Sequence, residues 1–250
     1  MTEKGQDNFE SGILWELYKD LERQFESFLE YVPFWEDNEK TYSFKLLNLI
    51  LNIGGHVDSA FKEMVKYPDF SSNTDCQKIV KIMKQSEENI KRGKAPITAP
   101  ISLSLKALDT LCGISEEKLI HKRLPEREFI VPFQPINKKT RAPNWWEIYN
   151  GVKHNLSDNL KEASLRNPVD ALAGAFLLNV RHIPALIRLY RFGLIKMQWN
   201  GESAGKSVCD EWEEQDFLDC INNKSNLQQG PFFVETSIFL YLYGKGTAQP

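Results

Sequence analysis

The chain has 250 residues, of which 42% are hydrophobic and 26% are charged, and its formal net charge at pH 7 is −3. This composition is typical of a globular protein with a substantial core, and it excludes the overall basic charge that marks many nucleic-acid-binding proteins. The four cysteines form no C-x-x-C pair and no Cys/His spacing typical of a zinc site, so we expect reduced thiols, no bound metal and no other cofactor.

A first helix is predicted over 13–32, where apolar residues recur at three- and four-residue steps until Pro33 ends the pattern. Its opposite side is acidic, and for these carboxylates we expect contact with solvent: Glu10, Glu16, Asp20, Glu22, Glu26 and Glu30. The polar residues before this helix lack the apolar run of a signal peptide, so we expect a cytoplasmic protein.

A second helix is predicted over 41–66, with Thr41 or Ser43 as its cap. Its Gly54-Gly55 pair indicates close packing or a bend, because each glycine otherwise costs about 1 kcal/mol of helix stability relative to alanine. The polar side chains of this helix share one stripe, which we expect to face water: Asn48, Asn52, His56 and Ser59.

The middle of the chain predicts two more helices, over 74–91 and over 101–111, the second ending at Gly113. The proline-rich stretch 115–141 is predicted to be loop with one strand near 129–133. It also holds the most basic patch of the chain, where nucleic acid would be expected to bind: Lys122, Arg123, Arg127, Lys138, Lys139 and Arg141.

Asn167-Pro168 predicts a helix start, followed by a helix at 171–180 that is apolar on nearly all sides and belongs at the centre of a bundle. Pro184 is expected to kink it, and the arginines beyond argue against a membrane span. Aromatic and β-branched residues at 232–243 favour strand. The predicted fold is all-α, a helical bundle over 9–195 with a small α/β or β appendage over 196–250.

The stretch 144–155 joins aromatic, charged and amide side chains in one predicted helix. At about 100° per residue, one face is the expected core stripe: Trp145, Ile148, Tyr149, Val152 and Leu156. Another face is polar: Glu147, Asn150, His154 and Asp158. Trp146 and Lys153 lie between the two faces, so Trp146 is expected to wall a groove while Lys153 offers its charge at the rim.

This edge would support limited chemistry, in which His154 moves protons, Glu147 holds the histidine tautomer and Lys153 or Arg141 offsets phosphate charge. The catalytic candidates are His154, Lys153, Asn150 and Glu147, and the binding candidates are Trp146, Arg141, Lys138 and Lys139. The alternative is structural, with the polar face hydrogen-bonded to a neighbouring helix such as the stripe that holds Asn48, Asn52 and His56.

Three features together resemble HEPN-like all-α domains over roughly 9–191. They are the string Trp-Trp-Glu-x-Tyr-Asn-x-x-Lys-His at 145–154, the Asn-Pro start with the Ala/Leu-rich helix that follows it, and the helix opening at 38–43. The resemblance implies a bundle of four or five helices, commonly a homodimer. Active members are metal-independent ribonucleases with an arginine shortly before a histidine. No arginine lies at that spacing before any histidine here, and Glu147, Ile148 and Tyr149 occupy those places before His154.

Three functions therefore remain open. The leading hypothesis is a HEPN-like protein that binds RNA, a nucleotide or a partner protein without the standard nuclease site. The first alternative is a metal-independent endoribonuclease of toxin or antiphage-defence type that uses His154, Lys153, Asn150 and Glu147. The second alternative is a structural protein-interaction module whose acidic first helix docks a partner.

Overall fold

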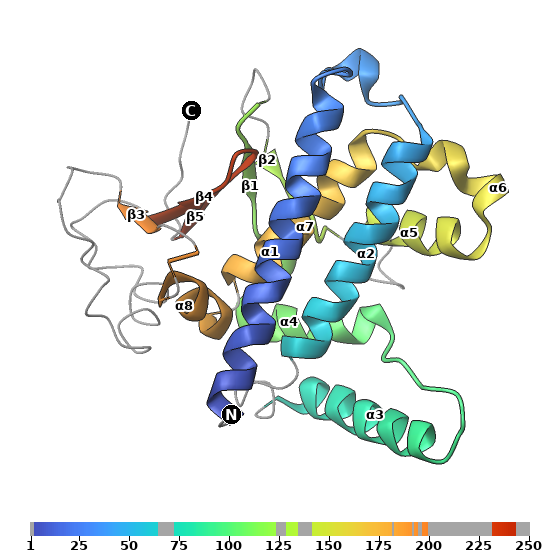
Figure 1. Cartoon of the computed structure of the whole chain (residues 1–250), viewed down its shortest axis with the longest axis vertical. Coiled ribbons are helices and arrows are strands. Elements are labelled where there is room, and N and C mark those ends of the chain that lie inside the picture. Colours follow the sequence, from blue (N-terminus) through green and yellow to red (C-terminus); the bar gives the residue numbers. More distant parts are fainter. Residues whose placement is uncertain are drawn as a thin grey trace.

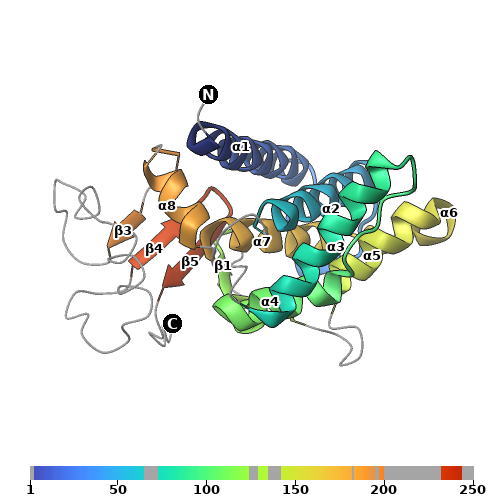
Figure 2. The same cartoon turned by 90° about the horizontal axis from the view of Figure 1, so that it is seen from below.

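The structure, a computed structural model, describes residues 3–64, 73–123, 129–134, 142–181, 183–191, 193–194, 197–199 and 232–243. A bundle of helices occupies one side of the molecule, and a small sheet occupies the other (Figure 1, Figure 2). The predicted fold class, an all-α bundle with a small β part, is confirmed.

The longer helices are α1 (Glu3–Leu29), α2 (Phe44–Met64), α3 (Thr74–Lys91), α4 (Ile101–Cys112), α5 (Asn144–His154), α7 (Arg166–Arg181) and α8 (Ile183–Arg191). Short helical turns connect them: η1 (Glu36–Asn38), η3 (Ile114–Glu116), α6 (Leu156–Asn159) and η4 (Leu160–Glu162). Each helix predicted from the sequence has a counterpart among these. Ser43 caps α2 by accepting the Leu46 backbone N–H at 3.2 Å.

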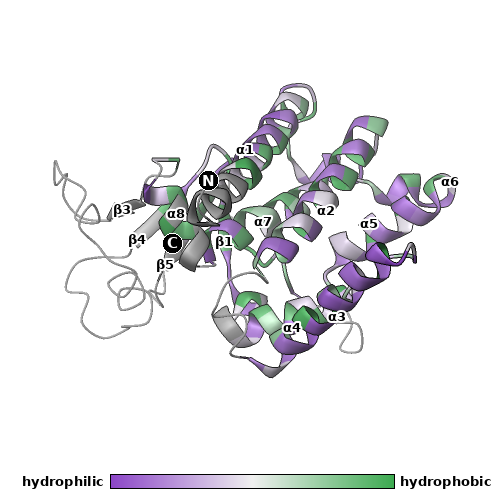
Figure 3. Ribbon diagram, turned by 60° about the horizontal axis from the view of Figure 1, so that its bottom comes forward, coloured by the Kyte–Doolittle hydropathy of each residue, from purple (hydrophilic) through white to green (hydrophobic). Residues whose placement is uncertain are grey.

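Helices α1, α2 and α7 contact one another and form the centre of the bundle, while α5 packs on α2 and α7. Hydrophilic and hydrophobic residues alternate along α1 and α2, as expected of helices with one face in a core (Figure 3). From Val169 to Val180, α7 is buried at every position except Asp170, which confirms its predicted central place. The predicted kink at Pro184 is a break between helices, since α7 ends at Arg181 and α8 begins at Ile183.

The start of α7 differs from the prediction. The helix begins at Arg166, and Asn167 lies inside its first turn with a buried side chain. The Asn167 amide donates to the Glu162 carbonyl at 2.7 Å and to Ser164 Oγ at 3.1 Å, and its oxygen accepts from Asn144 at 3.0 Å. Asn167 therefore joins α7 to the start of α5 instead of capping its own helix.

The sheet is antiparallel, with strand order β2-β1-β5-β4-β3. Its strands are β1 (Leu119–His121), β2 (Phe129–Ile130), β3 (Met197–Trp199), β4 (Phe232–Glu235) and β5 (Phe239–Tyr243). The stretch 115–141 thus supplies two short strands, where the sequence predicted one, and β1 pairs with β5 at Ile120–Leu240. The sheet consequently joins segments from both sides of the predicted boundary at 195, and that division into two domains stays a prediction.

A buried carboxylate fastens α1 to the sheet. Glu22, predicted to face solvent, is only 5% exposed and accepts hydrogen bonds from Tyr18 Oη at 3.2 Å, Ile238 N at 3.3 Å and Thr236 Oγ1. Burial raises the pKa of Glu22, although the hydrogen bonds from Thr236, Ile238 and Tyr18 oppose that shift. The prediction is wrong for Glu22 because the turn between β4 and β5, more than 200 residues away along the chain, covers it.

The glycine pair of α2 serves close packing at one of its two positions. A Cβ built on Gly54 would lie 2.3 Å from Cδ2 of Tyr149 on α5, whereas a Cβ on Gly55 would meet nothing within 4 Å. Gly54 thus lets α5 approach α2 more closely than any other residue would allow. The position of α5, and of Trp146 on it, depends on this contact.

Candidate functional site

The polar edge predicted on α5 is largely exposed. Glu147, Lys153 and His154 are exposed and Asn150 is half-buried. Lys153 lies along Tyr149, with its Nζ 3.4 Å from the phenol oxygen and 5.4 Å from the ring centroid. The cavity described below includes none of these four catalytic candidates.

Helix α5 ends at His154, so its predicted core face and polar face do not extend to Leu156 and Asp158. Asn155 has a non-helical backbone, and a new short helix, α6, begins at Leu156. Trp145, Tyr149 and Val152 are buried as predicted, but Leu156 is 47% exposed and the prediction of a core position there is wrong. Asp158 hydrogen-bonds to Asn155 and belongs to the turn that follows the helix.

The structural alternative predicted hydrogen bonds from this edge to a neighbouring helix, and for the α2 stripe it is wrong, since no hydrogen bond joins the two within the described residues. Asn48, Asn52 and Ser59 are exposed, as expected for a stripe that faces water. His56 instead is buried, and neither of its ring nitrogens has a hydrogen-bond partner among the described residues. Burial lowers the pKa of His56 to about 4, so the imidazole is neutral at physiological pH.

The basic patch is only partly placed. Arg127, Lys138, Lys139 and Arg141 lie outside the described residues. The two described members bind carboxylates of the same chain: Lys122 lies 2.8 Å from Glu235, and Arg123 pairs with Glu26. Their charges are therefore partly neutralised, which weakens the described part of the patch as a phosphate-binding surface.

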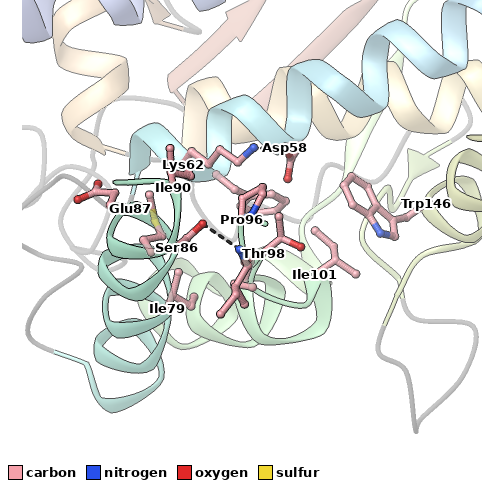
Figure 4. Close-up of a pocket in the computed structure, with 15 residues that line it drawn as sticks. Asp58, Lys62, Ile79, Ser86, Glu87, Ile90, Pro96, Thr98, Ile101 and Trp146 are labelled. Carbon is pink, nitrogen blue, oxygen red and sulfur yellow. Dashed lines mark hydrogen bonds and ion pairs between the residues drawn. The ribbon is translucent and has the colours of Figure 1, made fainter. Parts of the chain in front are cut away.

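A cavity of about 310 Å³ opens between α2, α3 and α4, with Trp146 of α5 at the end opposite α3 (Figure 4). Its apolar walls come from all four helices and from the loop between α3 and α4: Phe61, Ile79, Met83, Ile90, Pro96, Ile97, Ala99, Ile101 and Trp146. Its polar lining residues are Asp58, Lys62, Ser86, Glu87, Thr98 and Ser104. The position of Trp146 in the cavity wall agrees with the prediction that this side chain walls a groove.

Helix α3 faces the cavity with its apolar stripe. Ile79, Met83, Ser86 and Ile90 recur at steps of four, three and four residues and all line it. Of the residues of α3, Cys76 and Ile79 are buried, Met83 is half-buried and Ile90 is 59% exposed. An amphipathic helix normally buries such a stripe against a partner, and here part of the stripe meets the cavity instead.

The loop after α3 is fixed as a wall of the cavity. Ser86 Oγ accepts the Ile97 backbone N–H at 3.0 Å, a contact drawn in Figure 4, and the Asn89 side chain donates to the Ala95 carbonyl at 3.4 Å. At the other end of α3, Asp75 lies 2.7 Å from Lys106 of α4 and 2.9 Å from Lys78. These contacts hold α3 and α4 as a pair and keep the cavity preformed.

The charge at the cavity mouth is internally balanced. Lys62 Nζ lies 2.6 Å from the Asp58 carboxylate one turn earlier on α2. Lys62 is the cationic residue of the lining, and Glu87 adds a carboxylate. A ligand with phosphate groups would therefore meet a paired lysine and a nearby anion, which is unfavourable for a nucleotide.

Two polar side chains of the cavity lining carry no side-chain hydrogen bond to the described residues. Ser104 and Trp146 each have 7% of their surface exposed, and within the described chain neither the Ser104 hydroxyl nor the Trp146 indole N–H has a partner. The neighbouring Trp145 differs, because its indole N–H donates to the Pro132 carbonyl at 2.6 Å. An unpaired hydroxyl or indole N–H that lines a cavity can bind a polar atom of a ligand, and each of these two groups is suited to that role.

A second buried histidine, His121, is the last residue of β1 and belongs to the core. His121 stacks on Phe34 at 5.3 Å between ring centroids, and its Nδ1 accepts the Arg123 backbone N–H at 3.3 Å. Burial, followed by the charges of Arg123 and Arg166, lowers the pKa of His121 to about 4. Neither His121 nor His56 lines the cavity.

Comparison with known proteins gives no match to a protein-family model, a curated protein or a solved structure. No group of three or more His, Cys, Asp or Glu residues that could hold a metal ion occurs in the described part of the chain. None of the helices described is both long and apolar enough to cross a membrane. Function is therefore inferred from the chain's own residues.

The sequence alone indicated one wall of the cavity but missed the other. Trp146 was placed between two faces of its helix, which is why a groove was expected there. The α3 stripe was visible as Ile79, Met83 and Ile90 at helical spacing, followed by Pro96. That spacing predicts an apolar face, but it does not tell whether another helix covers the face.

Proposed function

We propose that this protein is a non-catalytic binding protein whose cavity takes a small molecule with an apolar body and one hydrogen-bonding group. The observation that carries the proposal is the preformed cavity between α2, α3 and α4, with an apolar wall and unpaired polar groups on Ser104 and Trp146. Its volume of about 310 Å³ lies at the lower end of the range typical of small-molecule sites.

The charges favour this ligand over RNA or a nucleotide. The lysine of the cavity is paired with Asp58, and the described basic residues Lys122 and Arg123 are paired with carboxylates. Nuclease chemistry is disfavoured because His154 lies on an exposed edge, outside the cavity, without an arginine at the spacing that active HEPN-like enzymes use.

The wider classification is also proposed. A divergent HEPN-like bundle is supported by the string at 145–154 and by the central placing of the Ala/Leu-rich helix α7. A homodimer is proposed from the same resemblance, and sedimentation velocity would test it. A cytoplasmic location is proposed from the four scattered cysteines, which form no C-x-x-C pair.

The proposal is tested with linear alcohols, which combine an alkyl body with one hydroxyl. We expect saturable binding of hexan-1-ol, heptan-1-ol and octan-1-ol in calorimetry, with affinity rising about fourfold per added methylene because each buried CH₂ contributes about 0.8 kcal/mol. The rise should stop when the chain fills the cavity. Absence of saturable binding across the series would overturn the proposal.

Two neighbouring positions on α3 give matched variants. Met83 lines the cavity and Ile82 does not, and both are half-buried. Met83→Trp is expected to fill the cavity and abolish binding, whereas Ile82→Trp should leave it within about twofold. Ser104→Ala should weaken binding about fivefold, the effect of losing a hydrogen bond of about 1 kcal/mol. Equal binding by Met83→Trp and Ile82→Trp would place the alcohol elsewhere and contradict the proposal.

A further inference from the structure

The connection between α1 and α2 exposes four aromatic side chains within a short stretch. Tyr31 is 81% exposed, Trp35 52%, Tyr42 45% and Phe44 68%. At about 200 Å² for each fully buried aromatic side chain, their exposed surface totals on the order of 500 Å². A surface of that size on a monomer often serves binding. These four residues are called the aromatic surface below.

The backbone that carries the aromatic surface is fixed. Phe34 points inward, is 5% exposed and stacks on His121. The Asn38 side chain donates to the Pro33 carbonyl at 2.9 Å, and the Leu165 N–H donates to the Thr41 carbonyl at 2.8 Å. Trp35 lies between the inward-facing Phe34 and η1 and therefore projects from an anchored segment. Binding of a partner there would cost this chain little conformational entropy.

The surroundings of the aromatic surface are negative. Helix α1 ends beside it without a basic residue of its own in its last turn, and Arg123 reaches that turn only through its ion pair with Glu26. Glu30, Glu36 and Asp37 follow, and no ion pair joins them to any described residue. Glu39 is paired with Arg166 at 3.3 Å. Two lysines also occur in the segment, Lys40 and Lys45, and they leave an acidic excess at its Tyr31–Asp37 end.

We propose that the Tyr31–Asp37 end of the aromatic surface docks a basic segment of a partner protein. Lysine or arginine side chains of that segment would lie on the faces of Trp35 and Tyr31, since an aromatic ring attracts a cation on its face. Their charges would pair with Glu30, Glu36 and Asp37, and Phe44 and Tyr42 would add apolar contact. Nucleic acid is disfavoured because its phosphates would meet these carboxylates.

This docking surface is independent of the cavity. The aromatic surface lies on the α1–α2 connection at the top of Figure 1, whereas the cavity lies between α2, α3 and α4 near the bottom. None of the aromatic surface residues lines the cavity. Loss of alcohol binding in Met83→Trp should therefore leave peptide binding unchanged.

The test uses two fluorescein-labelled peptides, one with three arginines alternating with leucines and one with glutamate in place of each arginine. Fluorescence anisotropy with the full chain is expected to show saturable binding of the arginine peptide and none of the glutamate peptide. Trp35→Ala should weaken binding at least tenfold, and Tyr31→Ala several-fold. Glu36→Gln should weaken it about threefold, and raising the salt concentration should weaken it further.

The chain offers matched controls for both kinds of contact. Phe129 is 44% exposed on β2, and Glu116 is an exposed carboxylate on η3. Phe129→Ala and Glu116→Gln should each leave arginine-peptide binding unchanged. Equal effects of Trp35→Ala and Phe129→Ala, or of Glu36→Gln and Glu116→Gln, would reduce the binding to general charge attraction and overturn the proposal. Preference for single-stranded RNA over the arginine peptide, or dissociation of a wild-type dimer by Trp35→Ala, would also overturn it.

Discussion

Alanine at Gly54 should separate α5 from α2, and the size of the effect follows from the contact itself. The added Cβ would lie 2.3 Å from Tyr149 Cδ2 and 2.5 Å from both Cε2 and Cγ. Because Cγ is at the root of the ring, a rotation of the ring does not relieve the overlap. Tyr149 is also 6% exposed and packed against Trp146 at 5.0 Å between ring centroids, so α5 itself has to move.

Overpacking of a core costs typically 1–3 kcal/mol and occasionally more, and for so short a contact we take about 4 kcal/mol. Alanine also stabilises the helix by about 1 kcal/mol relative to glycine, so the free energy of unfolding should fall by about 3 kcal/mol in total. For a chain of this size the melting temperature should fall by about 6–12 °C. Calorimetry or circular dichroism measures this change in melting temperature.

Gly55 is the matched control in the same helix. With nothing within 4 Å of its Cβ position, Gly55→Ala should raise the free energy of unfolding by about 0.5–1 kcal/mol. A Tyr149→Ala background removes the ring, so Gly54→Ala should be nearly neutral there, which a double-mutant cycle would detect. Similar stability of Gly54→Ala and Gly55→Ala, or an undiminished cost in the Tyr149→Ala background, would refute the packing argument.

Three further predictions concern the buried groups His56 and Glu22 and the exposed His154. The pKa of His56 is lowered from 6.5 to about 4, so the unfolded chain binds more protons between these pH values, and His56 alone should lower the free energy of unfolding by about 3 kcal/mol from pH 6.5 to 4. His121 should contribute in the same direction, and His56→Leu should remove only the His56 share from acid-unfolding curves. Glu22→Ala should cost about 2–3 kcal/mol in urea unfolding, because Ile238 N–H and Tyr18 lose their acceptor, while Glu22→Gln retains an acceptor oxygen and should cost less. Mixed RNA incubated with the purified protein in EDTA should stay intact; cleavage that disappears in His154→Ala would restore the nuclease hypothesis.

Local periodicity predicted the helices well because a buried face repeats every three or four residues. Trp145, Tyr149 and Val152 were placed correctly on this ground. Leu156 was misplaced because the helical repeat was continued through Asn155, where the backbone leaves the helix. The repeat describes a face well but does not locate the end of a helix without a clear cap.

Contacts between segments that lie far apart along the chain could not be predicted from the sequence. Glu22 had the pattern of a solvated carboxylate, and only the approach of the β4–β5 turn buries it. The cavity depends in the same way on where α3 packs, since its stripe would be ordinary core if another helix covered it. The exposed aromatic residues at 31–44 were likewise visible in the sequence, but their exposure was not.

The two adjacent tryptophans allow the most direct test of the cavity as a ligand site. In a ¹⁵N-labelled protein the indole N–H signals of Trp145 and Trp146, assigned with Trp145→Phe and Trp146→Phe, report a hydrogen-bonded and an unpaired donor respectively. Titration with octan-1-ol should shift the Trp146 signal to saturation and leave the Trp145 signal nearly unchanged. A Trp146 signal that stays in place while octan-1-ol binds, or equal shifts of both signals, would contradict the proposed site.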